Sequence, residues 1–117
     1  QQESIVIIEF SPTIFLKEGV IFSDGNAAVH TTATYSSKTT FYSDLKDMNK
    51  LNWACIHNDY WNDYVDGKRI KCAEVLVPDV IERGYITRIH YLKENPQLKD
   101  VAKKYGIELA YSPELYF

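Results

Sequence analysis

A short run of strand-forming residues, Cys72–Val77, carries a single charged side chain. Its apolar and β-branched residues favour a strand, and Pro78 ends the run because proline lacks a backbone N–H. Glu74 lies inside it, although burying an unpaired carboxylate is unfavourable by several kcal/mol. Either Glu74 lies on the solvated face of an edge strand or pairs with Arg69 or Lys71, or it is a catalytic carboxylate. In the second interpretation, the nearby cations receive an anionic ligand.

The size and composition predict one globular domain. The chain has 117 residues, of which 45% are hydrophobic and 25% are charged, the usual balance of a folded domain. The net charge of −3 provides no overall attraction to nucleic acid. Any contact with nucleic acid therefore has to use local clusters of side chains.

The cysteine and histidine positions predict neither a metal site nor a disulfide framework. Cys55 and Cys72 are far apart in the sequence, and His57 has no partner at a metal-ligand spacing. No apolar run reaches the ~20 residues that span a bilayer, and no signal peptide is visible. We expect a cytoplasmic protein with no metal and no membrane contact. The absence of an initiator Met indicates a trimmed or partial polypeptide.

The order of strand and helix patterns predicts an α+β fold. Strands are expected at Ile5–Phe10, Val20–Phe22, Cys72–Val77, within Ile81–Leu92, and at Ile107–Tyr111. Short helices are expected at Asp44–Met48 with Ser43 as cap, and at Trp53–Tyr60 with Asn49 or Asn52 as cap. A further helix starts at Asn95-Pro96 and stops at Gly106, with its apolar face made by Leu98, Val101, Ala102 and Tyr105. The strand at Ile5–Phe10 reads as buried, because its apolar run is almost continuous.

The segment Ser23–His30 contains a strong turn signal at Asp24-Gly25. One interpretation is a turn in which Asp24 or Asn26 caps a helix running through 27–29. The other is a corner between a strand and a helix, whose backbone and Asn side chain face a ligand.

Aromatic and small polar residues alternate along Asp59–Tyr64. Aromatic side chains on a loop can stack on nucleic-acid bases, or they can attach a long loop to the body of the domain. Trp53, Ile56, Tyr60 and Trp61 fall at helical spacing, so we expect some of them in the core.

The order of the sequence blocks resembles one known family. The series starts with Phe22–Ala28 and Phe41–Leu45 and continues through Leu51–Trp53, Tyr60-Trp61, Arg69 and Cys72–Pro78. It resembles the DarT family, the DNA ADP-ribosyltransferase toxins of bacterial toxin–antitoxin systems. The Asp-Gly-Asn-Ala-Ala and Ala-Glu-Val-Leu-Val-Pro blocks are its most specific parts, and the resemblance covers nearly the whole chain.

The resemblance implies an ADP-ribosyltransferase-like split β-sandwich with NAD as a substrate and no metal. Such an enzyme transfers ADP-ribose from NAD to a base of single-stranded DNA, and a macrodomain antitoxin removes the mark. The resemblance identifies Glu74 as the catalytic glutamate and the loop Asn26–Cys72 as the part that holds the base. The site residues it implies are Arg69, Tyr60, Trp61 and Tyr64 toward DNA, and Asp24 and Asn26 toward NAD.

The family's N-terminal segment, with its NAD-anchoring histidine and arginine, has no counterpart among the roughly twenty residues before the Asp-Gly-Asn-Ala-Ala block. We therefore expect the chain to be the C-terminal half of such an enzyme, a single partial domain of residues 1–117. Its missing half or another chain is then a possible partner. The alternative is a non-catalytic module on the same fold that binds nucleic acid or protein.

Overall fold

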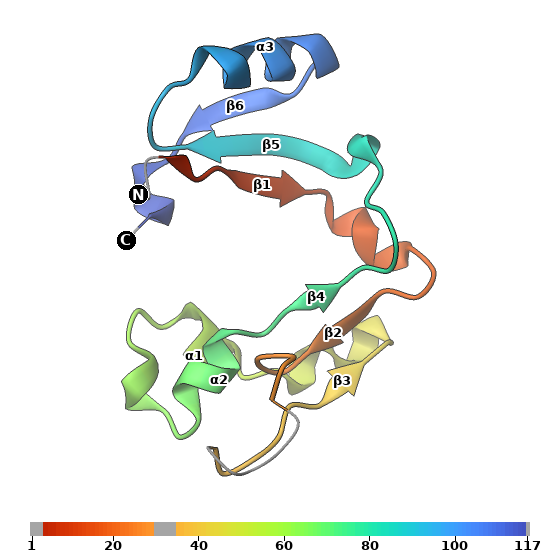
Figure 1. Cartoon of the computed structure of the whole chain (residues 1–117). Coiled ribbons are helices and arrows are strands. Elements are labelled where there is room, and N and C mark those ends of the chain that lie inside the picture. Colours follow the sequence, from red (N-terminus) through yellow and green to blue (C-terminus); the bar gives the residue numbers. More distant parts are fainter. Residues whose placement is uncertain (1–3, 30–34, 117) are drawn as a thin grey trace. The chain divides into compact units, whose positions relative to one another are not determined.

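The computed structural model describes residues 4–29 and 35–116, which form two compact units (Figure 1). Unit 1 comprises residues 1–14 and 81–117, and unit 2 comprises residues 15–80. Each unit contains a three-stranded sheet accompanied by short helices. The predicted α+β class is confirmed.

Unit 1 is built around β5 (Ile86–Tyr91), the central strand of its sheet. β1 (Ile7–Phe10) pairs with β5 in antiparallel orientation, and β6 (Glu108–Tyr111) pairs with it in parallel. Parallel neighbours require a crossover connection, which here contains α3 (Pro96–Tyr105) (Figure 1). The three strands predicted for this part of the chain are present.

α3 begins and ends at the residues that the sequence predicts. Asn95 is the cap, and its side-chain oxygen accepts hydrogen bonds from two backbone N–H groups of the first turn, at 2.8 and 3.3 Å. Pro96 occupies the first turn, and Gly106 ends the helix with a φ of 66°. Within the expected apolar face, Ala102 is buried whereas Val101 is exposed.

β1 is less buried than its apolar run suggests. Ile8 is 43% exposed, whereas Ile89 on the central strand is 6% exposed. The difference follows from position, because β1 lies at an edge of the sheet and has a neighbouring strand on one side only. The prediction of a buried strand at Ile5–Phe10 is therefore wrong, although the strand exists.

A polar network joins three segments of unit 1 around His90. The Nε2 atom of His90 lies 3.0 Å from Oε1 of Glu9, and its Nδ1 atom lies 2.7 Å from Oγ of Ser112. Thr87 donates a hydrogen bond of 3.0 Å to the other carboxylate oxygen of Glu9. The hydrogen bond from His90, followed by that from Thr87, lowers the pKa of Glu9 below its ordinary value of 4.5.

This lowered pKa makes the stability of the protein depend on pH. A carboxyl group with a lower pKa in the folded state contributes stability above its unfolded pKa and loses it as the pH falls through the folded pKa. We expect the unfolding free energy of the wild type to exceed that of Glu9→Gln at neutral pH, and the difference to shrink below pH 4.5. Urea unfolding at a series of pH values measures it. A difference that stays constant with pH would contradict the assignment.

Unit 2 is organised around β2 (Ile21–Ser23), which lies between β3 (Phe41–Tyr42) and β4 (Val75–Leu76). Both pairings are antiparallel. The sequence did not predict β3, because a strand of two residues is too short to show a periodic pattern.

Phe22 of β2 forms the centre of the core of unit 2, with 2% of its surface exposed. Its ring meets the edge of Phe15 at a centroid distance of 6.2 Å and stacks on Tyr42 at 5.6 Å. Cys55 and Leu51 are also buried, at 0% and 8% exposure. Strand and helix residues thus share one small core within the unit.

Most of the aromatic residues expected in that core are exposed. Trp53, Tyr60 and Trp61 expose 39%, 68% and 48% of their surface, and Ile56 is half-buried. The buried member of α1 (Trp53–His57) is Cys55. The helix ends at Asn58, so Tyr60 and Trp61 leave the helical spacing on which the prediction relied.

Two of the helices predicted for unit 2 are different. Residues 27–29 form a turn in which the N–H of Val29 donates to the carbonyl of Asn26 at 3.1 Å, and not a helix. The helix predicted to follow Ser43 is a 3₁₀ helix, η3 (Leu45–Lys50), and its cap is Asp44. The cap of α1 is Asn52, one of the two predicted residues.

The remaining helices are short. They are α2 (Gly67–Lys71) and the 3₁₀ helices η2 (Pro12–Leu16), η4 (Trp61–Asp63), η5 (Arg83–Tyr85) and η6 (Pro113–Leu115). Lys71 fastens α2 to the end of α1, because its ammonium group donates to the carbonyls of Ile56 and Asn58.

Gly67 opens α2 at a point where the chain passes close to Trp61. A Cβ atom on Gly67 would lie 1.7 Å from the carbonyl oxygen of Trp61, which no side chain tolerates. We expect Gly67→Ala to lower the unfolding free energy by about 1–3 kcal/mol, the usual effect of overpacking, measured as a lower urea midpoint. Gly84→Ala is the matched control, because its Cβ would meet no atom within 4 Å. Equal losses in both variants would refute the steric explanation.

Candidate active site

The candidate site of unit 2 starts from Ser23, the last residue of β2. Ser23 is 0% exposed, and its hydroxyl donates to the carbonyl of Gly25 at 2.6 Å. The N–H of Glu74 donates to the same hydroxyl oxygen at 3.0 Å, and the N–H of Ser23 donates to the carbonyl of Glu74 at 2.9 Å. The backbone of Glu74 is therefore attached to β2 through both of its polar groups.

The carboxylate of Glu74 is held by the turn that follows β2. Its Oε2 atom accepts a hydrogen bond of 2.9 Å from the N–H of Ala27. No described residue donates a hydrogen bond to its Oε1 atom. A backbone N–H is a rigid donor, so it fixes the direction of the carboxylate while one oxygen remains open to a ligand.

Glu74 lies directly before β4 and not within it. α2 ends at Lys71, and the N–H of Ala73 still donates to the carbonyl of Ile70 at 3.0 Å, so strand pairing starts only at Val75. The strand predicted at Cys72–Val77 is consequently shorter than expected.

The proposed pairing of Glu74 with Arg69 or Lys71 is wrong. Arg69 forms its ion pairs with Asp24 and Asp66, and the Lys71 ammonium donates to backbone carbonyls. Glu74 is exposed at an edge of the sheet of unit 2. The sequence-based alternative of a solvated carboxylate at an edge strand therefore fits its position, and this position is equally accessible to a substrate.

Arg69 is enclosed by the loop that precedes it. It is 4% exposed, and its Nη1 atom lies 3.2 Å from both Oδ1 of Asp24 and Oγ1 of Thr39. Its Nη2 atom donates to the hydroxyl of Ser37 at 3.0 Å. The predicted contact of Arg69 with DNA stays a prediction, and in this geometry the guanidinium group is occupied by protein partners.

The backbone of Arg69 also supports the turn beside Glu74. Its carbonyl oxygen accepts a hydrogen bond of 2.8 Å from the N–H of Asn26. A Cβ atom on Gly25 would lie 2.4 Å from Nη1 of Arg69 and 2.9 Å from its carbonyl oxygen. Glycine is therefore required at position 25, because the turn packs directly on Arg69.

Asp66 attaches a second segment to the same site. It has a left-handed backbone with a φ of 57°, and its carboxylate accepts four hydrogen bonds of 2.8 to 3.0 Å from the N–H and hydroxyl groups of Ser36 and Ser37. Burial raises the pKa of Asp66, but these hydrogen bonds outweigh burial and lower the pKa below 3.8. Asp66 is therefore an anionic anchor for this part of the loop at neutral pH.

The two residues predicted to contact NAD lie in the turn beside Glu74. Oδ1 of Asp24 accepts from the N–H of Thr40 at 2.8 Å and from Arg69. Oδ1 of Asn26 accepts from the N–H of Ala28 at 2.9 Å. The side-chain oxygens therefore shape the turn, and a role toward NAD stays a prediction for both residues.

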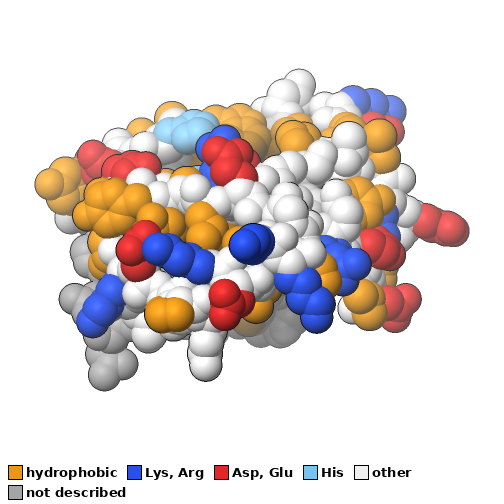
Figure 2. All heavy atoms as spheres, turned by 90° about the horizontal axis from the view of Figure 1, so that it is seen from above, with side chains coloured by type: hydrophobic (Ala, Val, Ile, Leu, Met, Phe, Trp, Pro, Cys, Tyr) orange, Lys and Arg blue, Asp and Glu red, His pale blue; other side chains and the backbone are white. Residues whose placement is uncertain are grey.

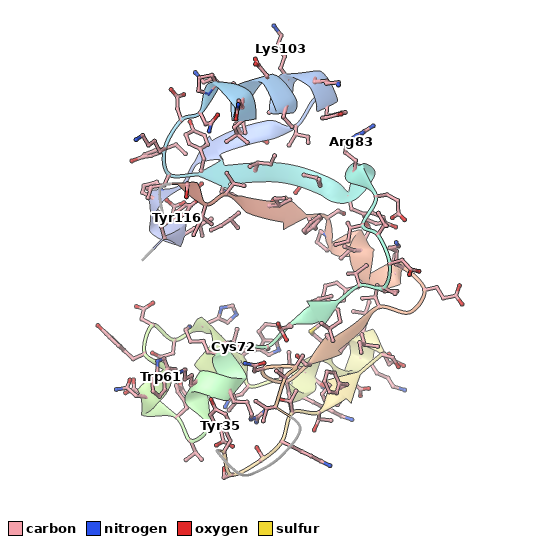
Figure 3. All side chains as sticks on the ribbon, in the orientation of Figure 1. Tyr35, Trp61, Cys72, Arg83, Lys103 and Tyr116 are labelled. Atoms are coloured by element: carbon pink, nitrogen blue, oxygen red, sulfur yellow. The ribbon has the colours of Figure 1, made fainter. Side chains whose placement is uncertain are left out.

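The three aromatic residues predicted to contact DNA lie on the segment between α1 and α2. Tyr60 and Trp61 are exposed, and Figure 3 shows Trp61 on this segment, with Cys72 at the end of α2. Tyr64 is half-buried, and its hydroxyl lies 3.5 Å from the side-chain nitrogen of Asn58. Tyr60 and Trp61 thus present rings to solvent, whereas Tyr64 is partly attached to the loop.

The sequence interpretation missed the residues that connect this loop internally. Ser36, Ser37 and Thr39 fell in a segment read as irregular, and Asp66 was read only as part of a turn. The useful signal was the concentration of Ser and Thr opposite a buried arginine, since such side chains satisfy guanidinium and carboxylate groups. The sequence alone does not pair residues that are about thirty positions apart.

The charged residues are dispersed on the face of the molecule drawn in Figure 2. Lys and Arg side chains alternate there with Asp and Glu, and form no continuous basic patch on that face. Among residues 4–29 and 35–116, no three His, Cys, Asp or Glu side chains form a possible metal site. Within the same ranges, no helix is long and apolar enough to cross a bilayer.

The sequence profile of one family, described as "ssDNA thymidine ADP-ribosyltransferase, DarT", matches residues 1–116 of the chain. The chain belongs to the DarT family. Its predicted membership is confirmed, and the turn that holds Glu74 contains the two sequence blocks on which that prediction relied.

Solved structures confirm the DarT-like fold. DarT of Thermus sp. 2.9, solved in complex with NAD⁺ and with ADP-ribosylated ssDNA, superposes with a TM-score of 0.81 at 19% identity over 99% of this chain. Thermosipho africanus DarTG in complex with ADP-ribose gives a TM-score of 0.69 at 25% identity over 96% of the chain.

The chain spans only part of these DarT relatives. It covers 59% and 56% of the two Thermus chains and 29% of the DarTG chain. A DNA ADP-ribosyl transferase–DNA ADP-ribosyl glycohydrolase fusion protein of Thermosipho africanus (strain H17ap60334) is 28% identical over 120 residues, which cover 98% of this chain and 29% of the fusion protein.

Proposed function

We propose that this chain is the part of a DNA ADP-ribosyltransferase that carries the catalytic glutamate. The enzyme transfers ADP-ribose from NAD to a base of single-stranded DNA. The observation that carries the proposal is the geometry of Glu74, whose backbone is anchored to Ser23 and whose carboxylate is directed by the N–H of Ala27. The family description and the NAD⁺ and DNA complexes of Thermus DarT support the choice of substrates.

The proposed reaction exchanges one bond to the ribose for another. The bond between the nicotinamide nitrogen and C1′ of the ribose breaks, and nicotinamide leaves with the electron pair. A nitrogen of the target base then forms a bond to C1′ and gives up its proton. The Glu74 carboxylate stabilises the positive charge that develops on the ribose and accepts this proton, which is general base catalysis.

The other predicted site residues have distinct proposed roles. Asp24 and Asn26 contact NAD from the turn beside Glu74, and the exposed rings of Tyr60 and Trp61 stack on DNA bases. Tyr64 supports the same aromatic segment from its half-buried position. For Arg69 we propose that the phosphate contact requires the surrounding loop to open, because the side chain is enclosed when the loop is closed.

We also propose that the enzyme acts as a toxin whose mark is removed by a macrodomain antitoxin. The relative from Thermosipho africanus supports this role, because its name joins a DNA ADP-ribosyl transferase to a DNA ADP-ribosyl glycohydrolase. An enzyme that modifies DNA bases requires a partner activity that restores them if the host is to survive.

The test is incubation of the full-length protein with labelled NAD and a mixture of single-stranded oligonucleotides. We expect the label to appear on DNA and the modified base to be identified by mass spectrometry. Binding of the oligonucleotides without any consumption of NAD would instead support the non-catalytic module. Transfer of label to protein only would contradict DNA as the acceptor.

A further inference from the structure

Unit 2 contains a cavity of about 270 Å³ beside Glu74. Apolar side chains form most of its wall, with Phe22 and Val75 from the sheet, and Met48, Leu51 and Trp53 from the η3–α1 segment. The indole nitrogen of Trp53 donates to the carbonyl of Met48 at 2.8 Å. This hydrogen bond leaves the ring of Trp53 as a flat, apolar part of the wall.

Polar side chains enter the wall at two residues only, Ser23 and Glu74. The hydroxyl of Ser23 is already bonded to the carbonyl of Gly25 and to the N–H of Glu74. A ligand in the cavity therefore finds one side chain with an unoccupied acceptor, the Glu74 carboxylate. Such an arrangement of apolar walls with one oriented polar group is typical of a ligand site.

The size and the chemistry of the cavity limit its occupant. Pockets for drug-sized ligands have volumes of about 300–1,000 Å³, so this cavity fits a single flat ring system and not a dinucleotide. The carboxamide of nicotinamide has an acceptor oxygen and two N–H donors, which apolar walls would leave unpaired. A thymine ring bound to DNA has one N–H group and a methyl group, which match a single carboxylate and an apolar wall.

We propose that this cavity is the subsite for the target base, and that its apolar wall selects thymine through the 5-methyl group. The inference rests on the proposed function and specifies its acceptor. The ring enters between the sheet and Trp53, and its N–H group points to the Glu74 carboxylate. On transfer, that nitrogen forms the bond to C1′ of ADP-ribose, and its proton passes to Glu74 as nicotinamide leaves.

The binding step is tested without catalysis by the fluorescence of Trp53. The chain has two Trp residues, so Trp61→Phe leaves Trp53 as the reporter. In the full-length protein we expect oligo(dT) to quench this fluorescence more strongly, and at lower concentration, than the matching oligo(dU), which differs only in the methyl group. Equal titrations for the two oligonucleotides would overturn selection through the methyl group.

Filling the cavity tests its location. Ala73 and Val75 both line it, so Ala73→Leu and Val75→Phe place additional atoms inside. Val75 is 42% exposed, which keeps the second variant informative if the first does not fold. Val80→Phe is the matched control, because Val80 is 68% exposed and does not line the cavity.

For the wild type we expect kcat/KM for transfer to dU oligonucleotides to be about 10–200-fold below that for dT, the effect of one methyl group in an apolar pocket. Both filled variants should lose transfer to dT by at least this factor, with the KM for NAD and the hydrolysis of NAD without DNA unchanged. Val80→Phe should behave as the wild type.

Each result decides the proposal. A raised KM for NAD in the filled variants would assign the cavity to nicotinamide, and unchanged transfer would show that no substrate enters it. Either result overturns the proposal. If the wild type transfers no ADP-ribose to DNA but the filled variants lose the dT-dependent quenching of Trp53, the proposed function fails and the base subsite stands.

Discussion

Glu74→Gln is expected to reduce transfer of ADP-ribose to single-stranded DNA by about 10²–10⁴-fold, the contribution typical of a positioned acid–base group. The amide oxygen of glutamine still accepts the hydrogen bond from Ala27, so the turn beside β2 keeps its geometry. The amide, however, carries no negative charge to stabilise the ribose and accepts no proton. Initial rates with labelled NAD and a single-stranded oligonucleotide measure the effect in the full-length protein.

The control for this substitution is Glu18→Gln. Glu18 is an exposed residue of the same unit, and we expect its variant to transfer ADP-ribose at the wild-type rate. The melting temperatures of both variants should match that of the wild type. Wild-type transfer by Glu74→Gln would exclude Glu74 as the catalytic carboxylate.

Arg69→Ala is expected to destabilise the protein by about 3 kcal/mol. Removing one member of a buried ion pair costs about 3–5 kcal/mol because the remaining charge is left without its partner. The Asp66 side chain is 8% exposed and that of Asp24 is 23% exposed, so Asp24 is partly stabilised by water and the loss falls at the lower end. Urea unfolding of the variant and the wild type measures the difference.

Two comparisons isolate the guanidinium group. Arg69→Lys keeps the charge but not the forked donor geometry, so we expect a stability between those of the wild type and Arg69→Ala. Lys50→Ala removes an ion pair with Asp47 in which the lysine is 59% exposed, and should cost at most about 1 kcal/mol. A loss as small in Arg69→Ala as in Lys50→Ala would show that the enclosed network contributes little, and would favour the DNA role of Arg69.

Local sequence signals predicted unit 1 better than unit 2. The ends of α3 followed from Asn95, Pro96 and Gly106, because caps and stop signals act within one turn of the helix. β5 and β6 were found from runs of several apolar residues. β3 escaped because two residues carry no pattern, and the exposure of β1 depends on its place at the sheet edge, which one segment does not reveal.

In the candidate site, the sequence indicated Glu74 and the turn at Asp24–Asn26, and the structure brings them together. The role of Arg69 as the centre of a network was not predictable, because its partners come from positions far along the chain. Whether an arginine faces solvent or is enclosed is a property of tertiary contacts. The cavity beside Glu74 was likewise hidden, since its walls come from three separate segments.

The pairing of β1 with β5 has a consequence for the order in which the protein forms. Ile7 pairs with His90, so unit 1 needs both ends of the chain, whereas unit 2 is one continuous segment between them. During synthesis from the N-terminus, β1 leaves the ribosome long before its partner strand and waits as an unpaired edge. Unit 2 is complete first. The catalytic turn can therefore fold while the sheet of unit 1 still lacks two of its strands.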